Sequence, residues 1–277
     1  MITIAVVNQK GGVAKSTTAV NLAVGLAASG HRVLGVDLDP QAHLTLGVGV
    51  STATVGADQT VAALFYPRPD IRSVIAPTAE PGLHLIPASI RLAKAQESLY
   101  NVAFKETKLK KALDQVCAQF DYVVMDCPPN LGVLSTAAIV AADKILVPTM
   151  LSRYSLDGLD DLLSTVSELR EDQETYEFRV LLTRVKGRAK RQEIAWSLLK
   201  PIEDRILETR IRESEAVEQS QMGDEDEMLS VVKESGTRNR AAEDYQALVK
   251  EVITLWPTAQ QPNNSETTSR STPAANG

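Results

Sequence analysis

The chain has 277 residues and a formal net charge of -6, which suits a single large α/β domain. This charge excludes binding to nucleic acid through the overall electrostatics of the molecule, so any such contact requires a local basic patch. The two cysteines, Cys117 and Cys127, are too few for a metal cage or a disulfide framework. No apolar run approaches the ~20 residues of a membrane-spanning helix, and strand-like residues follow Met1 directly in place of a signal peptide. We therefore expect a cytoplasmic protein without a membrane anchor.

Apolar, β-branched runs alternate with helical patterns along the chain, which predicts a doubly wound, mostly parallel sheet flanked by helices. The first strand is predicted at residues 2–7, and a helix follows at 15–29 and ends at Gly30, a good left-handed helix stop. Further strands are predicted at residues 32–37, 83–87, 121–126, 144–147 and 179–185. Further helices are predicted at residues 105–119, 155–171, 191–200 and 238–255, with one short helix at 61–65 inside a loop-rich stretch.

The composition changes abruptly at residue 257. From there to residue 277 the chain is rich in Pro, Asn, Ser, Thr, Gln and Gly, which cannot build a core. We expect residues 1–256 to form one domain and residues 257–277 to form a disordered polar tail.

A phosphate-binding loop is predicted between the first strand and the first helix. Gly11 and Gly12 allow the backbone to approach phosphate closely, and the following N–H groups at the positive end of the helix surround the anion. We expect Lys15 between the β- and γ-phosphates of ATP, the Ser16 hydroxyl on Mg²⁺, and Thr17 at the α-phosphate. The predicted ATP site is made of Lys10, Gly11, Gly12, Val13, Ala14, Lys15, Ser16 and Thr17.

Acidic residues end two of the other predicted strands. Asp126 ends strand 121–126, where a carboxylate can hold Mg²⁺, usually through water. Asp37 and Asp39 stand at the end of strand 32–37, where the pair can reach the metal and orient the attacking water. A simple acidic turn before Pro40 accounts for one of these two residues, but less readily for both.

Together these motifs resemble the ParA/MinD family of deviant Walker A P-loop ATPases over residues 1–255. The shared segments are Lys10 to Ser16, Asp37 to Gln41, Met125-Asp126-Cys127-Pro128-Pro129, Ala141-Ala142-Asp143-Lys144 and Val147-Pro148. The resemblance implies that Lys10 reaches the partner's phosphates across a nucleotide-sandwich homodimer, that Asp39 helps to activate the hydrolytic water, and that Asp126 is the Walker B acid. With Lys15, Lys10 and Asp39 are the expected catalytic residues, and Ser16, Asp126 and Asp37 are the expected metal ligands.

We expect no DNA-reading domain before the loop, which makes the chain similar to the short ParA-type ATPases and to McdA-like ATPases that position carboxysomes. The resemblance implies an ATP-dependent dimer that binds nucleoid DNA without sequence preference. It also implies ATP hydrolysis to ADP and phosphate that is slow alone and is stimulated by DNA or by a ParB-like or McdB-like adaptor on the cargo, which is a plasmid, a chromosome or a protein organelle.

The sequence departs from the family pattern at three points. Ala14 stands where many relatives have Gly, and its methyl group is tolerated if its backbone is helical. Ser16 replaces a Thr, which is a mild change. Residues 208–212 match a loop of partition ATPases that usually contains a proline, and here lack it, which puts base recognition and the usual partner in question.

A basic cluster after strand 179–185 is the candidate DNA surface. It contains Arg184, Lys186, Arg188, Lys190 and Arg191, and its possible extensions are Arg210, Arg212, Lys233, Arg238 and Arg240. Few aromatic residues accompany the cluster, so we expect contacts with phosphates and no base stacking. The alternative is a solvated loop after a strand.

Two rival functions stay open. A MinD-like positioning ATPase ends in a basic amphipathic helix that binds membranes, whereas the tail of this chain carries a single Arg270. A metabolic ligase of the dethiobiotin synthetase type uses the same loop on a small acid. Stimulation of ATP turnover by DNA or by a small carboxylic acid distinguishes this ligase from the partition ATPase.

Overall fold

The computed structural model describes residues 1–53, 55–66, 69–151, 153–170, 177–185, 199–214, 231–232 and 240–259. Within these residues one sheet of eight strands has the order β3-β4-β2-β5-β1-β6-β7-β8. All neighbouring strands are parallel except β3 and β4. The strands are β1 (Ile2–Val6), β2 (Val33–Asp37), β3 (Ala76–Pro77), β4 (Leu83–Ile86), β5 (Tyr122–Asp126), β6 (Lys144–Met150), β7 (Glu177–Val185) and β8 (Ile206–Arg212). The predicted doubly wound, mostly parallel sheet is therefore confirmed.

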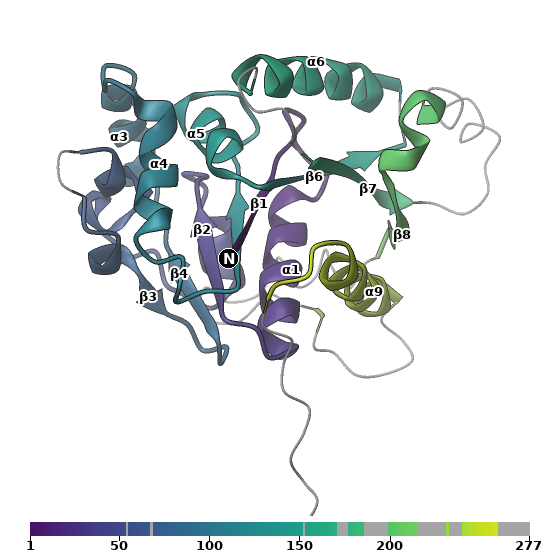
Figure 1. Ribbon diagram of the computed structural model, residues 1–277, viewed down its shortest axis with the longest axis horizontal. Helices are drawn as coiled ribbons and strands as arrows, with labels where there is room; N and C mark the ends of the chain where they lie inside the picture. Colours follow the sequence, from purple (N-terminus) through teal and green to yellow (C-terminus); the bar gives the residue numbers. More distant parts are fainter. Residues whose placement is uncertain are drawn as a thin grey trace, which may run out of the picture.

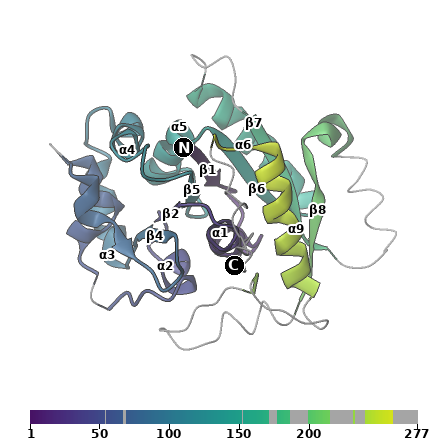
Figure 2. The same ribbon diagram turned by 60° about the horizontal axis from the view of Figure 1, so that its bottom comes forward.

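Helices cover both faces of this sheet (Figures 1 and 2). Their bounds are α1 (Lys15–Ala28), α2 (His43–Gly47), α3 (Arg91–Leu99), α4 (Lys105–Asp114), α5 (Val133–Ala141), α6 (Arg153–Leu169) and α9 (Arg240–Leu255). Short 3₁₀ helices lie at η1 (Ala57–Gln59), η2 (Val61–Phe65), η3 (Ile71–Val74) and η4 (Lys200–Arg205). Among the helices that the structure describes, none has the length and apolar character needed to cross a bilayer.

The alternation of side chains along β1 shows how the two faces are filled. Ile4 and Val6 belong to a buried cluster shared with α1, α2 and α9, whereas Ala5 and Val7 belong to a second cluster shared with α3, α4, α5 and α6. Because successive side chains of a strand point to opposite faces, a central strand buried on both sides is apolar throughout. This is why the central strands could be predicted from the sequence.

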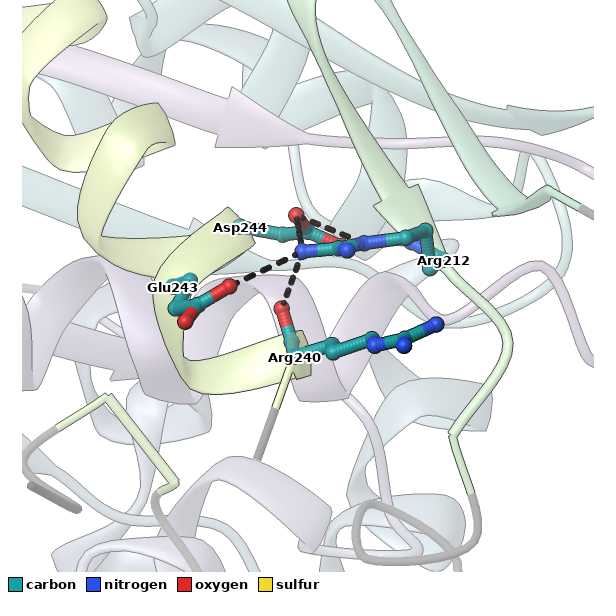
Figure 3. A network of polar contacts seen from close by, with 4 residues as sticks. All are labelled: Arg212, Arg240, Glu243 and Asp244. Carbon is teal, nitrogen blue, oxygen red and sulfur yellow. Dashed lines mark hydrogen bonds and ion pairs between the residues drawn. The ribbon is translucent and has the colours of Figure 1, made fainter. Parts of the chain in front are cut away.

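Helix α9 holds the edge strand β8 through its acidic side chains. The Glu251 carboxylate accepts hydrogen bonds from the backbone N–H groups of Glu208 (2.7 Å) and Thr209 (2.9 Å). The Asp244 carboxylate accepts one from the N–H of Arg212 (2.9 Å) and also binds the Arg212 guanidinium (Figure 3). These contacts join β8 and α9 side by side at one end of the sheet.

The expectation of a loop at residues 208–212 is wrong, because these residues form most of β8. Leu207 and Ile211 are buried against α9, while Glu208 and Arg210 are exposed. An edge strand with one solvated face alternates between apolar and polar residues. The charged residues on the solvated face prevented the prediction of this strand from the sequence.

Other predictions are resolved only in part. The left-handed stop at Gly30 is confirmed by its φ of 89°. The predicted helix at 191–200 lies outside the described residues except for 199–200, and the polar tail lies outside them beyond residue 259. The division into one domain and a tail stays a prediction.

Candidate functional site

The carboxyl ends of three adjacent strands bring the predicted site together. In the parallel register, Asp126 of β5 is paired with Val6 of β1 on one side and with Asp37 of β2 on the other. The loop at residues 8–14 leaves β1 at this edge and enters α1. Ligands of doubly wound sheets bind at the carboxyl edge where the strand order reverses, and β1 with its neighbours β5 and β6 occupies that position.

The loop has two residues in the left-handed conformation, Gly12 at φ 75° and Ala14 at φ 64°. The condition for tolerating the methyl group of Ala14, a helical backbone, is therefore not met. At the Ala14 position the chain must reverse its curvature before α1 begins, and the φ that this requires favours glycine. The structure thus stores backbone strain at the entry of the helix.

Neighbouring strands hold the loop in place. The Asn8 amide donates to the Pro148 carbonyl (2.8 Å), and its side-chain oxygen accepts from the Lys10 backbone N–H (2.9 Å). The Thr183 hydroxyl, from β7, donates to the carbonyl of buried Val13 (3.1 Å). Asn8 and Thr183 were not predicted as site residues. Asn8 and Pro148 are 140 residues apart and Thr183 and Val13 are 170 residues apart, and no local sequence pattern predicts contacts over such separations.

Lys15 lies largely buried at the first position of α1, with 7% of its surface exposed. Its ammonium donates to the Lys10 carbonyl (2.9 Å). Burial lowers the pKa of Lys15, against the attraction of Asp126, Cys127 and Asp39. A partly desolvated cation of this kind interacts strongly with a phosphate that enters the site.

The other residues of the predicted loop lie around this cation. Lys10 is partly exposed, Gly11 and Gly12 are exposed, and Ser16 and Thr17 are partly exposed on the first turn of α1. A methyl group added to either glycine would meet no atom within 4 Å, so the backbone there is open to a ligand.

Asp126 is the clearest sign that a ligand belongs here. It is fully buried, and neither carboxylate oxygen accepts a hydrogen bond of normal geometry from the described residues. Burial, followed by the nearby Asp37, raises the pKa of Asp126 well above its ordinary value, although the Ser16 hydroxyl and Lys15 act in the opposite direction. A buried carboxylate without donors is costly unless a cation or ordered water meets it.

The residues present fit a magnesium ion. The Ser16 hydroxyl and the Asp126 carboxylate offer the hard oxygen ligands that Mg²⁺ prefers, and Mg²⁺ usually takes only one or two protein groups together with phosphates and water. The described part of the chain has no cluster of three acidic, His or Cys residues that could hold a metal unaided. Ser16 and Asp126 are thus the groups that would hold Mg²⁺ together with a nucleotide.

Asp37 and Asp39 take different positions in the acidic turn. Asp37 is fully buried and accepts three hydrogen bonds, from the Asp39 N–H (3.1 Å), the Thr45 N–H (2.8 Å) and the Thr45 hydroxyl (2.7 Å). Burial raises the pKa of Asp37 to about 7, although the Thr45 bonds lower it. Asp39 is nearly buried and accepts from the Gln41 N–H (2.9 Å). Both oxygens of Asp37 are engaged within the protein, and its role as a metal ligand stays a prediction.

The candidate DNA surface is described only at its first residue. Arg184 lies in β7 with a left-handed φ of 51° and forms an ion pair with Glu213 at 3.7 Å. Lys186, Arg188, Lys190 and Arg191 lie outside the described residues. Arg212, one of the five possible extensions, is ion-paired with Asp244 and Glu243 of α9 (Figure 3), which neutralises its charge and disfavours a role in binding phosphate.

Comparison with known proteins agrees with this geometry. Residues 1–178 match the family model for an AAA domain (AAA_31). The sporulation initiation inhibitor protein Soj of Bacillus subtilis is 44% identical over 163 residues, which cover 59% of this chain and 64% of that protein. The chromosome partitioning protein ParA of Myxococcus xanthus is 39% identical over 61% of this chain and 59% of its own length. The chain thus spans less than two thirds of these relatives.

A solved structure of similar fold is apo McdA from Cyanothece. It is 27% identical with a TM-score of 0.77, covering 91% of this chain and 99% of that one. The match over residues 1–178, together with these likenesses, shows that the chain belongs to the AAA-domain family, as a P-loop ATPase of the ParA/MinD type.

Proposed function

We propose that this protein is a ParA-type ATPase that binds Mg-ATP, forms an ATP-sandwich homodimer on nucleoid DNA, and positions or segregates a cargo. The observation that carries the proposal is the fully buried carboxylate of Asp126, whose oxygens accept no hydrogen bond of normal geometry from the described residues although Ser16 and Lys15 lie near it. An ATP-bound metal would complete this arrangement. The similarity to Soj, ParA and McdA supports the same class of function.

Binding and hydrolysis divide among the residues of the site. The exposed backbone of Gly11 and Gly12 and the N-terminus of α1 receive the phosphates, and Lys15 neutralises charge between the β- and γ-phosphates. When bound, Mg²⁺ neutralises charge that develops on the phosphate oxygens. Asp39 orients the attacking water, which is a task of the transition state, whereas the loop supplies affinity in the ground state.

Dimerisation rests on Lys10. This residue is at the open mouth of the loop and is partly exposed. We propose that it reaches the phosphates of a second copy, so that two identical contacts form a two-fold interface. A cation that arrives from the partner stabilises charge on the transferred phosphoryl group, as an arginine finger does.

DNA binding follows from the dimer in this proposal. The basic cluster from Arg184 to Arg191 is small, and one copy makes too few phosphate contacts for tight binding in an acidic protein. Two copies on one body make the second contact effectively intramolecular and raise the avidity. Hydrolysis stimulated by a ParB-like or McdB-like adaptor then separates the copies and releases the DNA, in the cytoplasm at the nucleoid. The cargo is a partition complex or a protein organelle.

A ligase acting on a small acid is the second candidate. One observation favours it: a structure of cobyrinic acid a,c-diamide synthase from Mycobacterium smegmatis, with a bound ATP analogue and magnesium, is 28% identical to this chain. The TM-score of the match is 0.76, and the match covers 92% of this chain and 96% of the synthase chain. A test of the proposed function must therefore include a small-molecule arm.

The test measures ATP turnover and DNA binding in the same preparation. Binding isotherms on two unrelated duplexes, with ATP and with ADP across a salt series, should show binding that requires ATP and ignores sequence. Changing Arg188 and Arg191 to Glu should flatten the salt dependence, because each phosphate contact contributes ~0.9 to the log–log slope. ATP turnover without DNA should survive this change.

Lys15→Ala is the matched control, since it should lose ATP and therefore the DNA as well. Equal binding with ADP would refute the ATP switch. Turnover raised by a small carboxylic acid or by the larger cobyrinic acid, and not by DNA, would favour the ligase.

A further inference from the structure

Thr45, in the short helix α2, uses its backbone N–H and its hydroxyl on structures that border the site. It is fully buried. Its backbone N–H and its hydroxyl both donate to the same oxygen of Asp37, at 2.8 Å and 2.7 Å. The hydroxyl oxygen also accepts from the backbone N–H of Ala88 (2.9 Å), just beyond β4. Thr45 therefore joins the ends of two neighbouring strands, β2 and β4.

The same chain of hydrogen bonds continues to Asp39. The second oxygen of Asp37 accepts from the Asp39 N–H (3.1 Å), and the Asp39 carboxylate in turn accepts from the Gln41 N–H (2.9 Å). Asp37 is thus bound on one oxygen by Thr45 and on the other by the turn that carries Asp39. A change in the orientation of the Asp37 carboxylate would therefore weaken the hydrogen bond that holds the backbone of Asp39.

Helix α2 is also seated against the helix that follows the phosphate loop. A methyl group on Gly47 would overlap the side chain of Val20 in α1, so the two helices are in close contact. At the start of α2, Ala42 has a left-handed φ of 57°. The backbone N–H of Ala42 donates to the Asp39 carbonyl (2.8 Å), so the turn that carries Asp39 is bound to the start of α2. The position of Asp39 therefore depends on the packing of α2 against α1.

We propose that Thr45 is a positioning residue for ATP hydrolysis, acting through Asp37 to fix Asp39 against the phosphates. This inference rests on the proposed ATPase function. Thr45 touches neither nucleotide nor metal in this assignment. Its hydroxyl orients a buried carboxylate, and that carboxylate orients the residue that places the water. Outer groups of this kind act on the rate of a reaction through geometry, because small displacements of the reacting groups are costly.

Thr45→Val tests the proposal, since valine keeps the shape of the side chain and removes the hydroxyl. We expect ATP turnover to fall by at least about tenfold, while the affinity for ATP, measured by fluorescence titration, stays unchanged. Thr45→Ser restores the hydroxyl and should recover most of the turnover. If Thr45→Val does not fold, Thr45→Cys replaces it. The cysteine thiol is similar in size to the hydroxyl but is a weaker hydrogen-bond donor and acceptor.

Thr3 offers a matched control near the amino-terminal end of β1, at the other end of the strands from the site. Its hydroxyl donates to the Asp143 carboxylate (2.7 Å) and accepts from the Asp143 N–H (2.7 Å), which is the same pairing of a carboxylate and an amide. Thr3→Val should lose a similar amount of stability and keep normal turnover.

Turnover by Thr45→Val equal to that of the unchanged protein, or an equal loss in Thr3→Val, would overturn the positioning role. So would a loss of ATP affinity in step with turnover. An unchanged protein that does not hydrolyse ATP at all would instead refute the proposed function.

Discussion

Replacing Ala14 by glycine should stabilise the protein, although Ala→Gly usually destabilises. Ala14 holds φ 64° and ψ 34° immediately before α1. For a residue with a Cβ atom, this left-handed backbone costs about 1–2 kcal/mol. Glycine removes that cost, but its greater freedom in the unfolded chain returns about 0.5–1 kcal/mol. We therefore expect a net gain of about 0.5–1 kcal/mol in the free energy of unfolding.

The control is the same chemical change in an ordinary helix. Ala95 lies inside α3 and is partly exposed. Ala95→Gly should destabilise by about 1 kcal/mol, because glycine is a poor helix former and no strain is relieved there. Ala14→Gly and Ala95→Gly are thus expected to change the free energy of unfolding in opposite directions. A general effect of losing a methyl group would change it in the same direction at both positions.

Urea denaturation of the nucleotide-free protein, followed by circular dichroism, measures both changes. The comparison should be made without ATP and Mg²⁺, because a ligand that binds the folded state would mask a small difference in stability. If Ala14→Gly destabilises the protein as Ala95→Gly does, then Ala14 carries no strain and the left-handed entry to α1 is wrong.

Three further substitutions test the proposed roles. Asp126→Asn should abolish Mg²⁺-dependent turnover yet stabilise the nucleotide-free fold at neutral pH. The pKa of Asp126 is raised in the folded state from 3.8, so stability falls as pH rises above the unfolded value. Thermal denaturation from about pH 4 to pH 8 should therefore show the advantage of Asn growing with pH, and a constant advantage would contradict the assignment. Lys10→Ala should bind ATP as a monomer and fail to dimerise, which light scattering with ATP measures; a normal dimer refutes the trans contact. Asp39→Ala should bind ATP, dimerise and remain on DNA without turnover, and normal hydrolysis would make Asp37 the better candidate.

The central fold could be predicted because the strands that border the site are buried on both faces. The sequence at β1, β2 and β5 is almost continuously apolar, and this pattern needs no knowledge of neighbours. Strand β8 was not predicted because α9 covers only one of its faces. The other face is exposed and carries charged residues, so the sequence of β8 is not continuously apolar.

The candidate site was predictable to the extent that its residues form local motifs. The loop and Asp126 could be placed by their positions relative to strands. The contacts of Asn8 and Thr45 could not, because their partners are set by tertiary packing. The left-handed conformation of Ala14 could not be predicted either, because alanine usually favours the right-handed helix.

The hydrogen bonds between α9 and β8 have a consequence for the nascent chain during synthesis. An uncovered edge strand presents N–H and C=O groups on which another chain can build a sheet. Here the carboxylates of Glu251 and Asp244 occupy the N–H groups of Glu208, Thr209 and Arg212, and they belong to the last helix that the structure describes. The ribosome therefore completes the vulnerable strand before its cover. During that interval the N–H groups of Glu208, Thr209 and Arg212 lack the carboxylates that accept from them in the folded protein.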